Sequence, residues 1–365
     1  AASAEPARAK PPLSDTRALV AKARTLFFQL DETREDFKIA EDLLKQAIAK
    51  DGSDAEVWAA YAQLHQRYRA RGWDLSDQRR EDARAAMQRA LRLDPTSYEA
   101  RFAQTGLFLS GVRDGAERET ALRELLRERP DDQRVLRALA SLLRETPARR
   151  SEAWALYDRS ARLPGGDPLA LYNKALSLWF DARAAEAQAA LQEALKQQPF
   201  VGARLMEMHF ALTLRGDLEA ARRLLDRLPV AELMEDRGCY FAYLVHRFRD
   251  QPDEALAVVR AVARDWIDDN WFRGPRALLA GDALAQAGRP DAAAVEWRAA
   301  LKVVDTRLAS NPNELITLGH RLRLLAQLGE TAEARKLVPT LRQMTRVDEP
   351  DVLAPAWFTR SLLVL

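Results

Sequence analysis

The fold is decided by two adjacent segments of 34 residues, EARFAQTGLFLSGVRDGAERETALRELLRERPDD (residues 99–132) and QRVLRALASLLRETPARRSEAWALYDRSARLPGG (residues 133–166). Prolines mark the same interval on both sides of them, because Pro95, Pro130, Pro164 and Pro199 stand 35, 34 and 35 residues apart. Eight residues before each proline lies a large apolar side chain, in turn Met87, Leu122, Leu156 and Leu191. A period of this length is typical of helical repeat proteins, in which each repeat buries its apolar face against its neighbours.

The same period extends in both directions along the chain. Apolar residues at helical spacing, interrupted by glycine, proline and aspartate turns, predict nine helical hairpins within residues 15–348. Residues 1–14 are rich in alanine and proline and predict a linker, whereas residues 349–365 predict a capping helix. We therefore expect an all-α chain with essentially no strand.

The composition suits a folded helical chain, with 47% hydrophobic and 30% charged residues. A formal net charge of +2 gives no whole-chain attraction to nucleic acid or anionic lipid. The single cysteine, Cys239, excludes an intrachain disulfide and fits a reducing compartment. We expect a cytoplasmic location. Export to the periplasm is the alternative, because a chain that starts at Ala1 rather than Met is a processed or excised piece.

No segment predicts catalysis or metal binding. The four histidines fall in different hairpins, and no HExxH, P-loop, GxSxG or similar motif is present. Three aspartates gather in DWIDDNWFRG (residues 265–274), but they lack the regularly spaced ligands and closing glutamate of an EF-hand. We expect an acidic turn flanked by packed aromatic residues there, with no catalytic residue, no cofactor and no metal in the chain.

An arginine-rich segment spans residues 67–92 and holds eight arginines with four acidic residues interleaved. Because much of this charge is locally neutralised, we expect a solvated helix face. A docking patch for an acidic partner is the alternative.

The repeated residues resemble the tetratricopeptide-repeat (TPR) pattern, which places alanines, a bulky residue and an exit proline at set positions of each second helix. The second hairpin fits it with Ala83, Met87, Ala90 and Pro95, and the fifth with Ala187, Leu191, Ala194 and Pro199. Arg118, Glu152 and Arg159 depart from the pattern at alanine positions. The resemblance implies a right-handed α-solenoid of about nine TPR-like hairpins plus a C-terminal helix. The composition is also similar to TPR regions of bacterial multi-domain regulators.

The resemblance also implies where a partner binds. In TPR proteins the first helix of each hairpin lines a concave groove, which carries over to these residues of the fifth, sixth and seventh hairpins: Tyr172, Asn173, Trp179, Phe180, Met206, Phe210, Arg237, Tyr240, Phe241, Arg247 and Phe248. Aromatic and arginine side chains are typical binding hot spots. Packing in the core of a tightly wound superhelix is the alternative for several of them. The asparagine-rich clamp with which some TPR proteins hold C-terminal carboxylates is not reproduced, because Asn173 is its only matching asparagine.

We therefore predict a non-enzymatic protein–protein interaction scaffold that binds a peptide or a partner helix in this groove. The mixture of aromatic and arginine side chains favours an apolar segment that carries an acidic residue. A regulatory or oligomerisation segment of a larger multi-domain enzyme or transcriptional regulator is one alternative. An RNA-binding helical repeat is another, which the net charge disfavours. We expect no nucleic acid and no membrane span; the patterns leave the partner's identity and the oligomeric state open.

Overall fold

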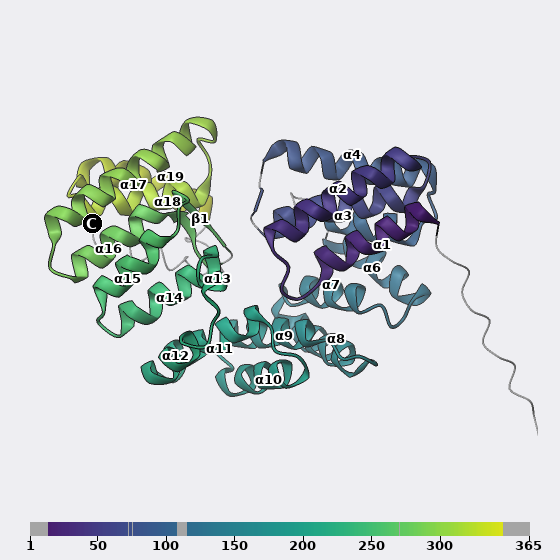
Figure 1. Ribbon diagram of the computed structural model, residues 1–365, viewed down its shortest axis with the longest axis horizontal. Coiled ribbons are helices and arrows are strands. Elements are labelled where there is room, and N and C mark those ends of the chain that lie inside the picture. The colour runs from purple at the N-terminus through teal and green to yellow at the C-terminus, as the bar shows by residue number, and fades with distance from the viewer. Residues whose placement is uncertain (1–13, 72, 75, 108–114, 270, 346–365) are drawn as a thin grey trace, which may run out of the picture. The chain divides into compact units, whose positions relative to one another are not determined.

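The computed structural model describes residues 14–71, 73–74, 76–107, 115–269 and 271–345 (Figure 1). The predicted linker, apart from Ser14, and the predicted capping helix lie outside these residues. The chain divides into two units, residues 1–203 and 204–365, and each is described by itself.

The first unit consists of consecutive antiparallel helix pairs. Its helices are α1 (Asp15–Phe28), α2 (Arg34–Lys50), α3 (Ala55–Ala70), α4 (Asp77–Leu93), α5 (Tyr98–Leu107), α6 (Gly115–Glu128), α7 (Gln133–Leu143), the 3₁₀ turn η2 (Pro147–Arg149), α8 (Arg150–Arg162), α9 (Pro168–Phe180) and α10 (Ala184–Gln197). The helix α11 (Val201–Thr213) begins in this unit and ends in the next.

The second unit continues the pairs and adds one short antiparallel sheet. Its elements are α12 (Leu218–Leu225), α13 (Val230–Leu233), α14 (Asp236–Phe248), α15 (Pro252–Ala261), β1 (Trp266–Asp268), β2 (Arg273–Pro275), α16 (Arg276–Gln286), α17 (Pro290–Ser310), α18 (Leu315–Gln327) and α19 (Thr331–Thr345). The succession of helices in the described residues agrees with the all-α repeat architecture that the sequence predicts.

Short polar side chains determine where the helices begin. At the start of α2, the Thr33 hydroxyl accepts from the Asp36 amide (3.1 Å), while the Asp36 carboxylate accepts from the Thr33 amide (2.8 Å). At α9, the Asp167 carboxylate accepts from the Ala170 amide at 3.2 Å. Such caps satisfy amides that have no partner inside the helix and stabilise it by about 1 kcal/mol each. Residues of this kind at helix starts can be recognised in a sequence.

The buried face of the second helices follows the predicted register in α4 and α10 but not in α8. The buried side chains of α4 include Ala83, Met87 and Ala90, and those of α10 are Ala187, Leu191 and Ala194. In α8 the corresponding buried residues are Ala153, Tyr157 and Ser160. The prediction that Leu156 is the core residue of this pair is wrong by one position, because Tyr157 is fully buried and Leu156 only half-buried.

The shift has a simple physical reason. One residue corresponds to a rotation of about 100° around a helix, so the observed register turns the charged Glu152 and Arg159 away from the core. The Glu152 carboxylate accepts from Arg149 (2.7 Å) and Arg123 (2.6 Å), which burial against apolar side chains would forbid. Glu152 and Arg159 therefore do not break the repeat; they lie beside its alanine positions.

The arginine-rich segment is a second correction. Arg79, expected on a solvated face, has a side chain only 16% exposed. It donates to Glu41 at 3.1 Å and Asp74 at 2.9 Å, and it lies 4.2 Å above the Tyr68 ring. Arg67 also turns inward and donates to the buried Glu32 at 2.5 Å. Part of this segment therefore holds helix pairs together instead of facing solvent.

The acidic segment 265–274 forms a short β-hairpin within an otherwise helical chain, so the expectation of essentially no strand agrees with the described residues. Strands β1 and β2 pair antiparallel, with Ile267 opposite Gly274. Ile267 is fully buried in the core of the second unit, so this hairpin is anchored by its apolar residue. Gly274 is required here, because a Cβ at this position would lie 2.6 Å from Nε2 of His320. Ile267 and Gly274 therefore pack inside the second unit and do not belong to a solvated loop.

Candidate functional site

The eleven predicted groove residues fall into groups with different environments. On α9 of the first unit, Tyr172, Asn173 and Trp179 are half-buried. Phe180 follows them and is 69% exposed, with its ring 5.0 Å from that of Trp179. Of these four predicted residues of the first unit, Phe180 is the one with an exposed side chain.

Three of the predicted residues of the second unit are buried. Met206, Phe210 and Phe241 are at most 1% exposed. The Phe241 ring packs edge-on against that of Trp271, with centroids 5.5 Å apart. These three side chains therefore offer no open surface to a partner.

Arg237 is also engaged within the chain. Its Nε donates to the Asp269 carboxylate of the β-hairpin at 2.9 Å, and the Arg237 side chain is 19% exposed. The sequence pattern predicts that this arginine contacts a partner, whereas in the structure it forms an ion pair with the β-hairpin.

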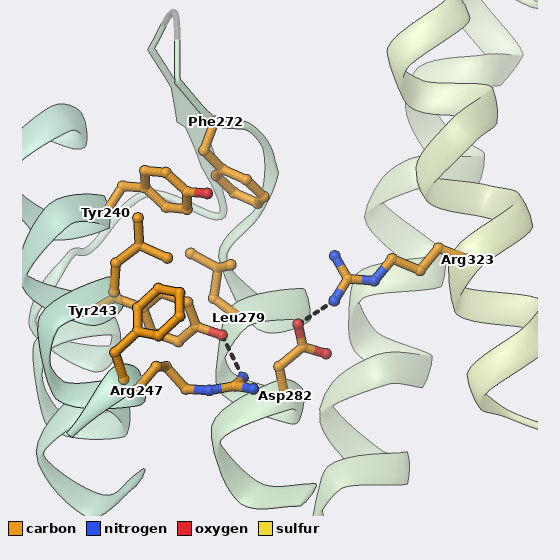
Figure 2. Close-up of a pocket in the computed structure, with 9 residues that line it drawn as sticks. Tyr240, Tyr243, Arg247, Phe272, Leu279, Asp282 and Arg323 are labelled. Atoms are coloured by element: carbon orange, nitrogen blue, oxygen red, sulfur yellow. Dashed lines mark hydrogen bonds and ion pairs between the residues drawn. The ribbon is translucent and has the colours of Figure 1, made fainter. Parts of the chain in front are cut away.

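The remaining predicted residues of the second unit, Tyr240, Arg247 and Phe248, lie together at a cavity of about 300 Å³ (Figure 2). The cavity is lined from α14, α16, α18 and the β-hairpin. Its other lining residues are Tyr243, Leu244, Phe272, Leu279, Asp282 and Arg323. It is therefore built by the first helices of three successive helix pairs.

Aromatic rings form the walls of the cavity. The rings of Tyr240 and Phe272 are stacked with centroids 5.1 Å apart and planes 14° apart, as Figure 2 shows at one end of the cavity. Tyr243 continues this wall, with its centroid 6.4 Å from that of Tyr240. Phe248 is 55% exposed at the end of α14. Such rings offer a large apolar area at little cost in side-chain entropy.

The charges of the cavity are unevenly paired. Asp282 is 8% exposed, and its carboxylate accepts from Arg323, from Trp297 Nε1 (3.2 Å) and from Gln327 Nε2 (3.0 Å). This carboxylate is saturated by donors from α17 and α18, and Figure 2 shows Arg323 reaching it from α18. Arg323 is thus neutralised inside the protein.

Arg247 differs from Arg323 in its partner. Its Nη1 donates to the Tyr243 hydroxyl at 2.8 Å, and it forms no ion pair with a carboxylate of the described residues. Burial raises the pKa of the Tyr243 phenol above its ordinary value, so this hydroxyl is neutral and accepts the hydrogen bond. The cavity therefore carries one positive charge that is oriented but not neutralised.

Comparison with known proteins bears on the fold alone. No family model and no curated protein matches the sequence. Among solved structures, yeast Tom70 matches with a TM-score of 0.55 and 11% identity, over 92% of this chain and 66% of that one. IFIT1 with m7Gppp-AAAA matches with a TM-score of 0.55 and 14% identity, over 91% and 72%. The APC/C hetero-tetramer Cut9–Hcn1 matches with a TM-score of 0.50 and 14% identity, over 96% and 64%. The fold is of the TPR type.

Sequence reasoning missed several residues that line the cavity, among them Tyr243, Phe272, Asp282 and Arg323. Tyr243 lies three residues after Tyr240 and four before Arg247, a helical spacing that would have placed it on the same face. Asp282 and Arg323 lie in the first helices of the eighth and ninth pairs, to which the groove positions were not extended. Phe272 could not be found this way, because it belongs to the β-hairpin.

Two observations on the described residues concern metal binding and thiol chemistry. No group of three or more His, Cys, Asp or Glu side chains suited to a metal ion occurs among residues with a described position. The Cys239 thiol is buried, which raises its pKa to about 12 and disfavours the thiolate. Within the described ranges, none of the helices combines the length and the hydropathy needed to cross a bilayer.

Proposed function

We propose that this protein is a non-enzymatic protein-interaction scaffold whose cavity on α14, α16 and α18 receives a segment of a partner protein. The observation that carries the proposal is Arg247, a half-buried arginine among aromatic rings with no carboxylate partner in the described structure. A partner's carboxylate would supply this counter-charge, while an apolar side chain beside it would pack on the rings.

The size of the cavity favours a protein segment over a small molecule. A volume of about 300 Å³ lies at the lower limit of pockets that enclose drug-sized ligands. It accommodates one or two side chains, which is the usual scale of an anchor residue in a protein interface. The exposed Phe248 at its edge adds apolar area that a longer segment would cover.

Charge pairing favours protein over nucleic acid. Several arginines of the second unit are neutralised within the chain, as in Arg237–Asp269, Arg323–Asp282 and Arg264–Asp236. Binding to a phosphate backbone requires several cations in a row, whereas a single free guanidinium suits one carboxylate. The aromatic pair Trp179–Phe180 on α9 is proposed as a second contact surface in the first unit.

Display of random peptides tests the proposal directly. Peptides selected on the purified chain should be enriched in an aromatic or aliphatic residue next to Asp or Glu. Arg247→Gln should weaken their binding by about tenfold or more, since charge-assisted hydrogen bonds contribute about 1.5–3 kcal/mol. Phe248→Ala should weaken binding as well.

Arg260→Gln is the matched control. Arg260 lies on α15, is half exposed and pairs with Glu296, away from the cavity lining. Its replacement should leave peptide binding unchanged. If the selected peptides bind the Arg247→Gln and Phe248→Ala variants as tightly as the original chain, the cavity is not the binding site.

A further inference from the structure

Helix α14 presents an arginine together with aromatic side chains twice along its length. The first set consists of Arg237, Tyr240 and Phe241, and the second of Tyr243, Arg247 and Phe248. The first set is covered by the chain's own β-hairpin, and the second lines the cavity. The covered set therefore shows how this helix face holds a ligand-like segment.

The β-hairpin contacts the first set through one carboxylate and two rings. Asp269 is 6% exposed and accepts from Arg237 Nε at 2.9 Å. The Phe272 ring stacks on Tyr240 at 5.1 Å, and the Trp271 ring meets Phe241 edge-on at 5.5 Å. Charge and aromatic area are thus matched together, as at binding hot spots.

The geometry of the turn brings these groups to the same side. The Asp269 amide donates to the Phe272 carbonyl at 3.0 Å, which closes a tight turn between the two strands. The Asp269 carboxylate also accepts from the Trp271 amide at 3.1 Å. A carboxylate and an aromatic ring three residues apart can therefore reach an arginine and a tyrosine of one helix face simultaneously.

The second set offers the same chemistry without a covering segment of the described chain. Arg247 is oriented by the Tyr243 hydroxyl at 2.8 Å and has no carboxylate partner there. Phe272 is shared, because it stacks on Tyr240 and also lines the cavity. A ligand in the cavity would thus lie beside the resident turn and extend the row of contacts along α14.

We propose that the second set binds a tight turn of a partner protein that presents an acidic residue and, three positions later, an aromatic residue. This inference rests on the proposed function, and it adds the conformation and the spacing of the recognised segment. The carboxylate pairs with Arg247, and the ring packs against the exposed Phe248 and against the cavity wall that Tyr243 and Phe272 form. A basic turn is disfavoured, since Arg247 and Arg323 both line the cavity and only Asp282 opposes them.

The probe is a fluorescent peptide with the sequence of residues 266–275 flanked by two cysteines and closed by a disulfide. Its binding to the full chain is followed by fluorescence anisotropy. We expect saturable binding that weakens about tenfold or more when the peptide carries Asp269→Asn, and likewise when it carries Phe272→Ala. In the protein, Arg247→Gln should cause a similar loss, whereas Arg260→Gln should cause none.

A double-mutant cycle connects the two sides. If the peptide carboxylate pairs with Arg247, the peptide change Asp269→Asn should have little further effect on the Arg247→Gln protein. The inference is overturned if the unchanged peptide and the Asp269→Asn peptide bind equally well to the original chain. It is also overturned if the losses from Asp269→Asn in the peptide and Arg247→Gln in the protein are fully additive. Thermal unfolding of each protein variant is measured in parallel, so that a loss caused by misfolding is recognised.

The two proposals fail differently. If displayed peptides require Arg247 and Phe248 but show no acidic residue three positions before an aromatic one, the turn inference is wrong and the proposed function stands. If no selected peptide and no cyclic probe depends on these two residues, both are wrong. Preference for a linear peptide over the closed one would also overturn the turn inference.

Discussion

Replacing Asp282 with asparagine should lower stability and strengthen binding of an acidic ligand at the same time. Asp282 is almost fully buried, and its carboxylate accepts hydrogen bonds from Arg323, Trp297 and Gln327. These donors belong to α17 and α18, so one side chain of α16 connects three helices. Stability and binding change in opposite directions because the Asp282 carboxylate stabilises the fold but, as the negative charge of the cavity, repels an acidic ligand.

The stability loss can be estimated from the bonds that change. Asparagine keeps one carbonyl oxygen for Trp297 and Gln327 but loses the charge-assisted bond from Arg323, which contributes about 1.5–3 kcal/mol. Because the Arg323 side chain is 29% exposed and can be hydrated after the change, we expect a cost of about 2 kcal/mol. Asp282→Ala also removes the acceptor for the other two donors and should cost about 3–5 kcal/mol.

The gain in binding comes from freeing Arg323. Without the Asp282 charge, both guanidinium groups of the cavity, those of Arg247 and Arg323, lack a carboxylate partner among the described residues. The acidic cyclic peptide should therefore bind a few-fold more tightly, which is on the order of 1 kcal/mol at an effective dielectric constant of about 20. The gain should shrink in high salt. Denaturant unfolding followed by circular dichroism and anisotropy titration measure the two effects.

Asp253→Asn is the matched control, because Asp253 is exposed and pairs with Arg289 in the same unit. It should cost no more than about 1 kcal/mol and leave binding unchanged. The reasoning is refuted if Asp282→Asn leaves stability unchanged. It is refuted equally if the variant binds the acidic peptide more weakly while remaining folded.

Two further predictions concern the fold. Tyr157→Ala should cost about 3–5 kcal/mol and Leu156→Ala about 1–2 kcal/mol, because only Tyr157 is fully buried; equal or reversed costs in denaturant unfolding would restore the register expected from the sequence. Burial lowers the pKa of three histidines from 6.5 to about 4, those of His65, His209 and His320. The unfolded chain then binds more protons between these values, so stability is complete above pH 6.5 and falls as the pH drops toward 4. The loss should be about 2 kcal/mol per histidine from pH 7 to 5, and unfolding free energies that are equal at both pH values would contradict it.

The sequence by itself determined the helical repeat architecture. Periodic apolar residues and exit prolines depend only on neighbours along the chain, as do capping residues such as Thr33 and Asp167, so their effects can be read locally. The aromatic and arginine face of α14 was also visible, since residues spaced by three and four lie on one side of a helix.

Only the tertiary structure decided which of those side chains remain available. Arg79, Arg237 and Arg247 are all arginines on predicted helices, and the sequence does not distinguish them. In the structure Arg79 and Arg237 donate to carboxylates that lie more than 30 residues away along the chain, Glu41 and Asp269. The one-residue rotation of α8 and the β-hairpin at Ile267 were decided in the same way. All of these features depend on which residues, distant in the sequence, come together in the protein interior. An unpaired charge or an empty space in that interior costs more free energy than a local helix or turn preference contributes.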